Sequence, residues 1–225
     1  MGQSGALRAS RLTLAPDVHS EVSHLAARPR VHVIDYGMGN LTSVRHALEY
    51  LGADVVVSGD PAGLARAAHA ILPGVGSFRV AMHNLRSAGL VDAIHAFVGD
   101  ADRRLLGICL GMQLIGTSST EDGITEGLGL VDAVVERFRD DPSGRCRVPH
   151  VGFARVTPDD RSVLLPPADG PSDFYFVHSY RVPADRCSGV VGSAQHGEPF
   201  VAMVEAGNIA GTQFHPEKSQ SSGLR

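Results

Sequence analysis

The chain has no tryptophan, few aromatic residues of any kind (5%) and no run of 18 or more apolar residues. A helix that crosses a bilayer needs about 20 such residues, so the sequence predicts no transmembrane segment. Neither sign of charge is in large excess, since 20 Lys and Arg face 24 Asp and Glu for a net charge of −4. Without a basic surplus to attract phosphates or anionic lipids, we expect neither a nucleic-acid partner nor a membrane partner.

Cysteine is also scarce, with three in the chain: Cys109, Cys146 and Cys187. An odd number at these wide spacings fits neither a disulfide framework nor a zinc knuckle. The sequence therefore predicts a cytoplasmic protein whose thiols are reduced, with no metal and no other cofactor.

Residues 1–30 differ from the rest of the chain. Their apolar residues are scattered, without sustained periodicity, and they contain no apolar core of a secretory signal. We expect a flexible N-terminal extension here and a single folded domain over residues 31–225. The chain as a whole is 43% hydrophobic, which is enough for a well-buried core.

From residue 31 onward, short apolar segments alternate with helical patterns. Strands are expected at 31–35, 54–58, 70–76 (running into a glycine-rich loop) and 104–108, and helices at 41–52, 59–70 and 80–100, the last broken at Gly89. Apolar strands separated by helices predict an α/β fold of three layers, an open, mostly parallel sheet with helices on both faces. After about residue 127 the pattern becomes alternating and rich in turns, which predicts added antiparallel strands in the C-terminal half.

The stretch RRLLGICLGMQLI, residues 103–115, changes from a buried strand to the start of a helix at Cys109, between Gly107 and Gly111. This G-x-C-x-G corner matches a nucleophile elbow, which exposes the corner residue at the carboxyl edge of the sheet. The free N–H groups of the following helix favour a thiolate, and the N–H of Leu110 is placed to bind an oxyanion. We predict that Cys109 is a catalytic nucleophile, the alternative being a buried structural cysteine.

A cysteine nucleophile needs a base, and the base needs an orienting acid. The segment GTQFHPEKS offers His215 and Glu217, and residues two apart in an extended segment lie on the same side. The other candidate base is His178, in the segment YFVHSY. The sequence predicts a triad of Cys109, His215 and Glu217, with His178 as the alternative base.

The pairing of GICLGMQ with FHPE resembles the class I, triad-type glutamine amidotransferases. Five further stretches extend the likeness to the glutamine amidotransferase subunits of imidazole glycerol phosphate synthase, an enzyme of histidine biosynthesis: VIDYGMGNLTSVRHAL, LPGVGSF, VPHVGF, YFVHSYR and FHPEKS. The resemblance covers residues 31–225. It implies a glutaminase that releases ammonia from L-glutamine and passes it to a separate cyclase subunit in a heterodimer. The cyclase makes imidazole glycerol phosphate and aminoimidazole carboxamide ribotide.

The resemblance also assigns residues that bind the substrate. It implies that Gln113, one helical turn past the nucleophile, contacts the substrate glutamine. Ser179 and Tyr180 would hold its amino-acid end, largely through backbone groups, and Glu121 would face its ammonium group.

A second oxyanion donor is implied in the loop PGVG, residues 73–76. The donor would come from Val75 or Gly76 after a peptide reorients. Flanking glycines lower the steric cost of such a reorientation, and Pro73 anchors one end of the loop.

The resemblance places two further residues toward the partner subunit. Asn40, in the loop YGMGN, would lie at the mouth of the site, where it helps to gate or conduct ammonia. Phe153 stands where the family usually has tryptophan, so a contact with the partner is expected to be altered. The family also continues beyond the position of Arg225 into a closing helix, so we expect one face of the sheet to be less covered here.

Other interpretations remain open at this point. The chain could be the glutaminase subunit of a pyridoxal phosphate synthase or the corresponding anthranilate synthase component, although PGVG and DYGMGN argue against both. It could be a catalytically silent subunit that only binds its partner, which the intact triad disfavours. A cysteine peptidase of a related family is disfavoured by Gln113 and FHPE.

Overall fold

The computed structural model describes residues 28–139, 146–166, 169–187 and 189–225, so the predicted N-terminal extension lies almost wholly outside the described residues. Its centre is a seven-stranded sheet in the order β11-β12-β13-β4-β3-β1-β2. Five strands run parallel: β1 (Arg30–Ile34), β2 (Asp54–Ser58), β3 (His69–Leu72), β4 (Arg104–Ile108) and β13 (Ile209–Thr212). The remaining two, β12 (Glu198–Ala206) and β11 (Val190–His196), extend one edge in antiparallel fashion.

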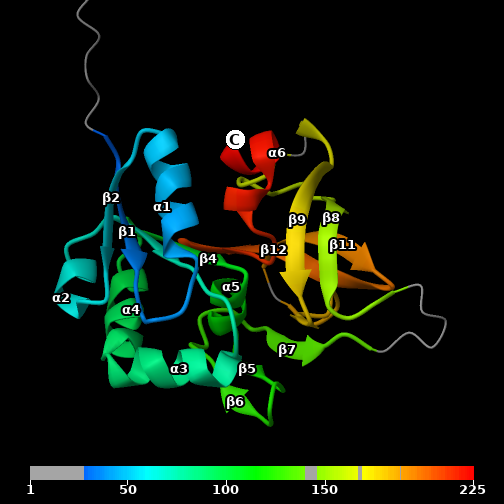
Figure 1. Ribbon diagram of the computed structural model, residues 1–225, viewed down its shortest axis with the longest axis horizontal. Helices are drawn as coiled ribbons and strands as arrows, with labels where there is room; N and C mark the ends of the chain where they lie inside the picture. The colour runs from blue at the N-terminus through cyan, green and yellow to red at the C-terminus, as the bar shows by residue number, and fades with distance from the viewer. Residues whose placement is uncertain (1–27, 140–145, 167–168, 188) are drawn as a thin grey trace, which may run out of the picture.

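Helices cover both faces of this sheet (Figure 1). On one face lies α1 (Leu41–Tyr50), whose Val44 and Leu48 pack against Val33 and Ile71. The opposite face carries α2 (Pro61–Leu64), α3 (Phe78–Ser87), α4 (Leu90–Val98) and α5 (Leu110–Leu114), which bury the largest hydrophobic cluster of the protein. The predicted three-layer α/β fold is confirmed.

Two helix boundaries follow from local signals in the sequence. The Asp60 side chain accepts hydrogen bonds from the backbone N–H groups of Ala62 and Gly63 at 3.0 and 3.1 Å, and Pro61 takes the first helical position. The resulting helix α2 is a single turn, much shorter than the 59–70 segment expected. Gly89, at φ +67°, separates α3 from α4 as predicted.

The C-terminal half contains two smaller sheets beside the central one. One has the order β10-β7-β5-β6, and the other pairs β8 with β9. Their bounds are β5 (Ser118–Ser119), β6 (Thr125–Glu126), β7 (Val134–Arg137), β8 (His150–Val156), β9 (Ser172–His178) and β10 (Tyr180–Arg181), and the chain closes with the 3-10 turn η2 (Pro216–Lys218) and α6 (Gln220–Leu224).

The antiparallel strands predicted for this half are confirmed by the pairing of β8 with β9 and of β11 with β12, but β13 is an exception. We expected its strands to be antiparallel additions, but β13 inserts next to β4 and runs parallel to it, with Thr212 opposite Ile108. The chain can make this pairing because it enters the sheet at the edge with β11, and β12 and then β13 follow inward, each antiparallel to the strand before it. The carboxyl ends of β4 and β13 therefore lie side by side.

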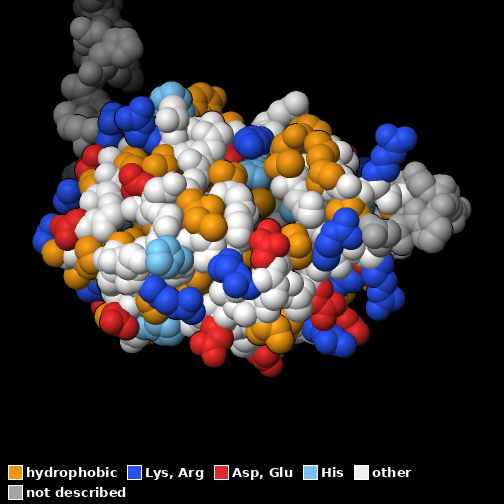
Figure 2. Space-filling view, turned by 60° about the horizontal axis from the view of Figure 1, so that its bottom comes forward, with side chains coloured by type: hydrophobic (Ala, Val, Ile, Leu, Met, Phe, Trp, Pro, Cys, Tyr) orange, Lys and Arg blue, Asp and Glu red, His pale blue; other side chains and the backbone are white. Residues whose placement is uncertain are grey.

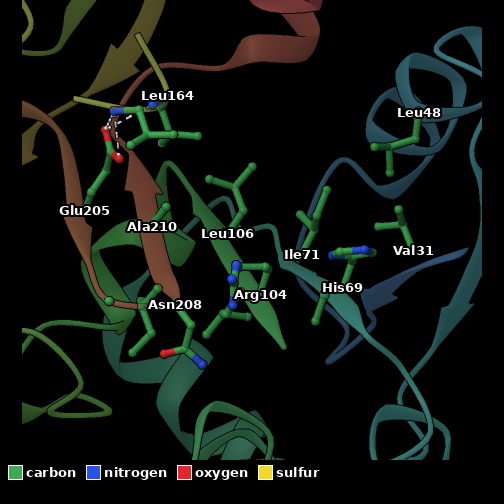
Figure 3. Close-up of a pocket in the computed structure, with 15 residues that line it drawn as sticks. Val31, Leu48, His69, Ile71, Arg104, Leu106, Leu164, Glu205, Asn208 and Ala210 are labelled. Carbon is green, nitrogen blue, oxygen red and sulfur yellow. Dashed lines mark hydrogen bonds between the residues drawn. The ribbon is translucent and has the colours of Figure 1, made fainter. Parts of the chain in front are cut away.

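An open groove of about 520 Å³ lies over the α1 face of the sheet (Figure 3). Its apolar floor comes from Ile71, Leu106 and Ala210, and Leu48 of α1 borders it. On the far side, the Glu205 carboxylate accepts hydrogen bonds from the backbone N–H groups of residues 163 and 164 at 3.1 Å.

The described surface carries both signs of charge. On the face seen in Figure 2, acidic and basic side chains are interspersed over the molecule. Among the described residues, no helix is both long enough and apolar enough to cross a membrane.

Candidate active site

Cys109 occupies a strained corner between β4 and α5. Its backbone has φ +53° and ψ −106°, a conformation that residues other than glycine rarely adopt. Its N–H donates to the Thr212 carbonyl at 2.7 Å. A Cβ at Gly111 would lie 1.8 Å from the Leu72 carbonyl oxygen, and one at Gly107 would lie 2.7 Å from the Gly111 backbone. Both glycines are therefore required for the corner to form, because neighbouring backbone passes too close for any side chain.

This strain predicts a measurable difference in stability between two inactive variants. Cys109→Gly should have a free energy of unfolding about 1 kcal/mol higher than Cys109→Ala, because alanine keeps a Cβ at this positive φ and glycine does not. Both variants lack the sulfur, so its burial cancels in the comparison. Urea unfolding of the pair tests the expectation, and an alanine variant of equal or greater stability would show that the corner is not strained.

The parallel pairing of β13 with β4 brings His215 to the sheet edge where Cys109 lies. His215 follows β13 at the edge where Cys109 follows β4, and it is 2% exposed. Its Nδ1 lies 2.8 Å from Oε1 of Glu217, whose side chain is also buried. Its Nε2 has no hydrogen bond of its own among the described residues, which leaves that nitrogen for the sulfur.

The electrostatics of His215 favour an ion pair with the thiolate. Burial alone lowers the pKa of His215, but its interactions with Cys109 and with the Glu217 carboxylate outweigh this effect and raise the pKa to about 9. A buried imidazole that keeps its proton at neutral pH is suited to pair with a thiolate and to act as a general acid.

His178 is placed differently, and the geometry favours His215 as the base. The ring of His178 is bonded at both nitrogens, with Nδ1 2.8 Å from the Tyr180 carbonyl oxygen and Nε2 3.1 Å from Nδ1 of His150. Burial lowers the pKa of His178 to about 3, against the opposing effect of the Tyr180 carbonyl. Burial and the neighbouring His196 lower the pKa of His150 to about 4.

These two buried neutral histidines predict a loss of stability in acid. The unfolded chain takes up their protons below a pKa of about 6.5, whereas the folded protein resists until about pH 4 for His150 and pH 3 for His178. Stability therefore falls as pH falls, by about 2 kcal/mol per histidine between pH 8 and pH 5. Urea unfolding at the two pH values should show a smaller loss for His178→Asn than for the wild type. The exposed His83→Asn variant is the matched control, and equal losses in all three proteins would contradict this account.

A cavity of about 280 Å³ opens in front of Cys109, near the lower end of the range for small-molecule sites. Eight residues predicted from the sequence line it, together with Val177 and His178: Val75, Gly76, Cys109, Leu110, Gln113, Glu121, Ser179 and Tyr180. These residues come from four separate segments of the chain: 75–76, 109–113, 121 and 177–180. The parallel strands β3 and β4 end at the same edge of the central sheet, which places the 75–76 loop beside α5, and the smaller sheets bring Glu121 and residues 177–180 to the same cavity.

The groups available to bind an oxyanion flank the sulfur. Leu110 is the first residue of α5, so its N–H has no partner within the helix. Across the cavity, the Tyr36 hydroxyl donates to the Pro73 carbonyl at 2.8 Å and holds the start of the 73–76 loop. A Cβ at Gly74 would lie 2.4 Å from that hydroxyl, so this glycine is needed for close approach as well as for freedom of its peptide.

Three other predicted residues have clear positions. Glu121 uses Oε2 to accept the Phe78 N–H at 2.8 Å, which leaves Oε1 as the candidate acceptor for an ammonium group. Asn40 caps α1 by accepting the Ser43 N–H at 3.4 Å, a structural role beyond the one expected from the sequence. Phe153 is 52% exposed on β8 and lies outside the cavity lining.

Two residues at the site were not found from the sequence. Tyr36 belongs to the DYGMGN motif, but nothing in the sequence indicates that it reaches the 73–76 loop. Gln213 is fully buried, and its Nε2 lies 3.7 Å from the Cys109 sulfur. A signal for Gln213 was available, because it stands two residues before His215 in an extended segment and so lies on the same side.

Known proteins of similar sequence support the family resemblance. A family described as glutamine amidotransferase class-I matches residues 32–223. The chain is 44% identical over 201 residues to imidazole glycerol phosphate synthase subunit HisH 2 of Nitrobacter winogradskyi, covering 87% of this chain and 94% of that protein. It is 49% identical over 198 residues to the HisH subunit of Geobacillus thermodenitrificans, covering 86% and 91%.

Solved structures resemble the fold at lower identity. A glutamine amidotransferase crystal structure matches with a TM-score of 0.64 and 20% identity, covering 86% of this chain and 94% of that chain. The PurLQS structure from Thermotoga maritima matches with a TM-score of 0.62 and 20% identity, covering 84% and 88%. At this level of identity the likeness supports the fold alone.

Proposed function

Because the chain belongs to the class I glutamine amidotransferase family, we propose that it is the glutaminase subunit of an imidazole glycerol phosphate synthase. The observation that carries the proposal is Cys109 on its strained corner beside the buried His215–Glu217 pair. The family resemblance read from the sequence motifs is confirmed by the match over residues 32–223.

The geometry supports a two-step hydrolysis. The Cys109 thiolate attacks the side-chain amide carbon of L-glutamine, and the N–H of Leu110 stabilises the oxyanion, joined by a donor from Val75 or Gly76. His215 then gives its proton to the departing nitrogen, which leaves as ammonia and produces a glutamyl thioester. His215 next takes a proton from water, the hydroxide attacks the thioester, and glutamate leaves as the thiol reforms.

The substrate would lie along the cavity wall formed by α5 and the segment between β9 and β10. We assign the amino-acid end of glutamine to the backbone of Ser179 and Tyr180 and its ammonium group to Glu121. Gln113 would contact the substrate from α5. All four residues line the cavity, which supports these roles.

Ammonia must reach a second active site while it is still neutral, because ammonium is not a nucleophile. We propose that a separate cyclase subunit receives it in a heterodimer and makes imidazole glycerol phosphate and aminoimidazole carboxamide ribotide. Three cysteines at wide spacings suit a reducing compartment, so we place the complex in the cytoplasm.

An exposed apolar face borders the cavity and fits a partner subunit. On the β8–β9 sheet, Val151 pairs with Val177 and Phe153 pairs with Tyr175 across the strands. Val151 and Phe153 are 57% and 52% exposed, and Val177 also lines the cavity. Large exposed apolar residues in a cluster are typical of a protein interface. We propose that the cyclase docks here, and a gating role for Asn40 remains part of the same proposal.

Activation by the partner tests this function. The isolated chain should release glutamate slowly, because the second oxyanion donor depends on a loop whose peptides reorient. Adding a cyclase subunit and its nucleotide ligand should raise the rate by roughly a hundred- to a thousandfold, the value of one oxyanion donor. The assay measures glutamate at saturating glutamine. An isolated chain that already works at the rate of the complex would show that its loop is preorganised.

A further inference from the structure

The Tyr180 carbonyl oxygen begins a chain of hydrogen bonds that ends at the nucleophile. It accepts the N–H of His178 Nδ1 at 2.8 Å and an N–H of Gln113 Nε2 at 3.0 Å. A carbonyl oxygen can only accept, so it settles which end of the Gln113 carboxamide faces it. The Gln113 nitrogen must point toward Tyr180.

The orientation of Gln113 determines that of Gln213. The second N–H of Gln113 Nε2 donates to Oε1 of Gln213 at 3.0 Å, so the Gln213 oxygen faces Gln113. If Gln213 were turned over, two donor nitrogens would face each other in a buried site, which is unfavourable. The Gln213 nitrogen therefore faces the other way, and its distance to Sγ of Cys109 is 3.7 Å.

From this chain we infer that Gln213 is a further catalytic residue, whose side-chain N–H stabilises the Cys109 thiolate. The inference rests on the proposed glutaminase function, which it deepens. Gln213 is completely buried and Gln113 is 5% exposed, so water does not compete strongly for these N–H groups.

The sulfur needs such a donor when it loses its proton. In the thiol form, Sγ lies 4.0 Å from the Val177 carbonyl oxygen, which can accept the S–H proton. In the thiolate form the Val177 carbonyl cannot hydrogen-bond to the sulfur, because both groups are acceptors. The proton moves from Sγ to Nε2 of His215, and the Gln213 N–H, which is not transferred, then supports the sulfur from the side of β13.

The same chain couples the substrate-binding segment to the nucleophile. Ser179 and Tyr180 line the cavity where the amino-acid end of glutamine is expected. His178 holds the Tyr180 carbonyl in place, and Gln113 transmits its position to Gln213. A displacement of Tyr180 would therefore weaken the donor at the sulfur.

Alkylation of Cys109 by iodoacetamide measures thiolate formation without requiring turnover. The rate of alkylation is followed against pH by mass spectrometry of the peptide that contains Cys109, which separates it from the other two cysteines. Gln213→Met keeps the length of the side chain but removes the donor. Because a hydrogen bond to a charged group stabilises that group, its loss should raise the midpoint of the pH profile by about one unit. Below the midpoint, this shift corresponds to a roughly tenfold lower fraction of thiolate.

The adjacent buried Thr212 supplies the matched control. Its hydroxyl donates to the Phe214 carbonyl and not to the sulfur, so Thr212→Val removes a buried hydrogen bond while leaving the alkylation midpoint unchanged. A midpoint for Gln213→Met that equals the wild type, or a shift that Thr212→Val reproduces, would overturn the inference.

A second measurement uses the wild-type fold, in case Gln213→Met does not fold. The side-chain amide signals of Gln213, in protein labelled with ¹⁵N-glutamine, should shift with pH at the midpoint found by alkylation. The shift should vanish in Cys109→Ala. Gln213 amide signals that do not change with pH at the alkylation midpoint, or that change equally in Cys109→Ala, would overturn the inference.

The outcomes separate this inference from the proposed function. If the wild type with its cyclase partner hydrolyses glutamine but neither measurement responds to Gln213, the function stands and the inference fails. If the midpoint shifts but no glutamine is hydrolysed with the partner present, Gln213 supports the thiolate and the proposed function fails.

Discussion

Cys109→Ala should lower glutamine hydrolysis by at least about 10⁴-fold, the scale of loss seen when a nucleophile is removed from a hydrolytic triad. The variant has no atom that can form the thioester, so the second half of the reaction has no substrate. The change removes one buried sulfur and leaves the corner backbone in place, so the fold and partner binding should persist.

Ammonia-dependent synthesis by the assembled complex gives the control for this variant. When ammonium salts at alkaline pH replace glutamine, the complex with Cys109→Ala should make imidazole glycerol phosphate at close to the wild-type rate. Cys187→Ala is the matched variant and should keep glutamine hydrolysis. A Cys109→Ala protein that hydrolyses glutamine at near the wild-type rate would remove Cys109 from the mechanism.

His215→Ala should cause a loss of hydrolysis comparable to that of Cys109→Ala, whereas Glu217→Gln should cost at least about tenfold less. In the proposed mechanism His215 takes and gives protons at the reacting atoms, while Glu217 orients the ring through its 2.8 Å contact with Nδ1 and stabilises the charged form. Steady-state rates of glutamate release for the two variants in the presence of the partner test the order.

The pH profile separates an orienting role for Glu217 from a merely structural one. Glu217 helps to raise the pKa of His215 to about 9, so the protonated ring is lost only in alkaline solution. Without the carboxylate, the pKa of His215 falls and the alkaline limb of the rate profile should move to lower pH. A Glu217→Gln variant that is slower than His215→Ala, or that has an unmoved alkaline limb, would mean that His215 has another partner.

The order of elements through β4 could be predicted from the sequence because each depends on local signals. Asp60 and Pro61 start a helix, and Gly89 breaks one. The apolar strands that alternate with these helices are stable only in a sheet that is covered on both faces. The length of α2 could not be predicted, because its alanine-rich continuation is compatible with a helix and only tertiary packing ends it. The parallel pairing of β13 with β4 was missed since it joins segments about a hundred residues apart and leaves no local pattern.

In the candidate site, too, features set by a short segment could be predicted, and features set by tertiary contacts could not. The Cys109 corner and the His215–Glu217 pair could be predicted because each lies in one short segment with a definite geometry. The sequence favoured His215 over His178 as the base, but it could not show that Tyr180 and His150 occupy both nitrogens of His178. Gln213 was missed although the two-residue rule that joined His215 to Glu217 applies equally to it.

Labelling by an electrophilic analogue of glutamine tests the central claim most directly, because it asks which atom attacks at the γ-carbonyl position. The complex is treated with a diazoketone that has the shape of glutamine, and the modified peptide is identified by mass spectrometry as activity is lost. We predict one label per chain, on Cys109, in proportion to the loss of glutaminase activity and prevented by excess L-glutamine. A label on Cys146, Cys187 or any other residue, in the same proportion and with the same protection, would contradict the assignment of the active site.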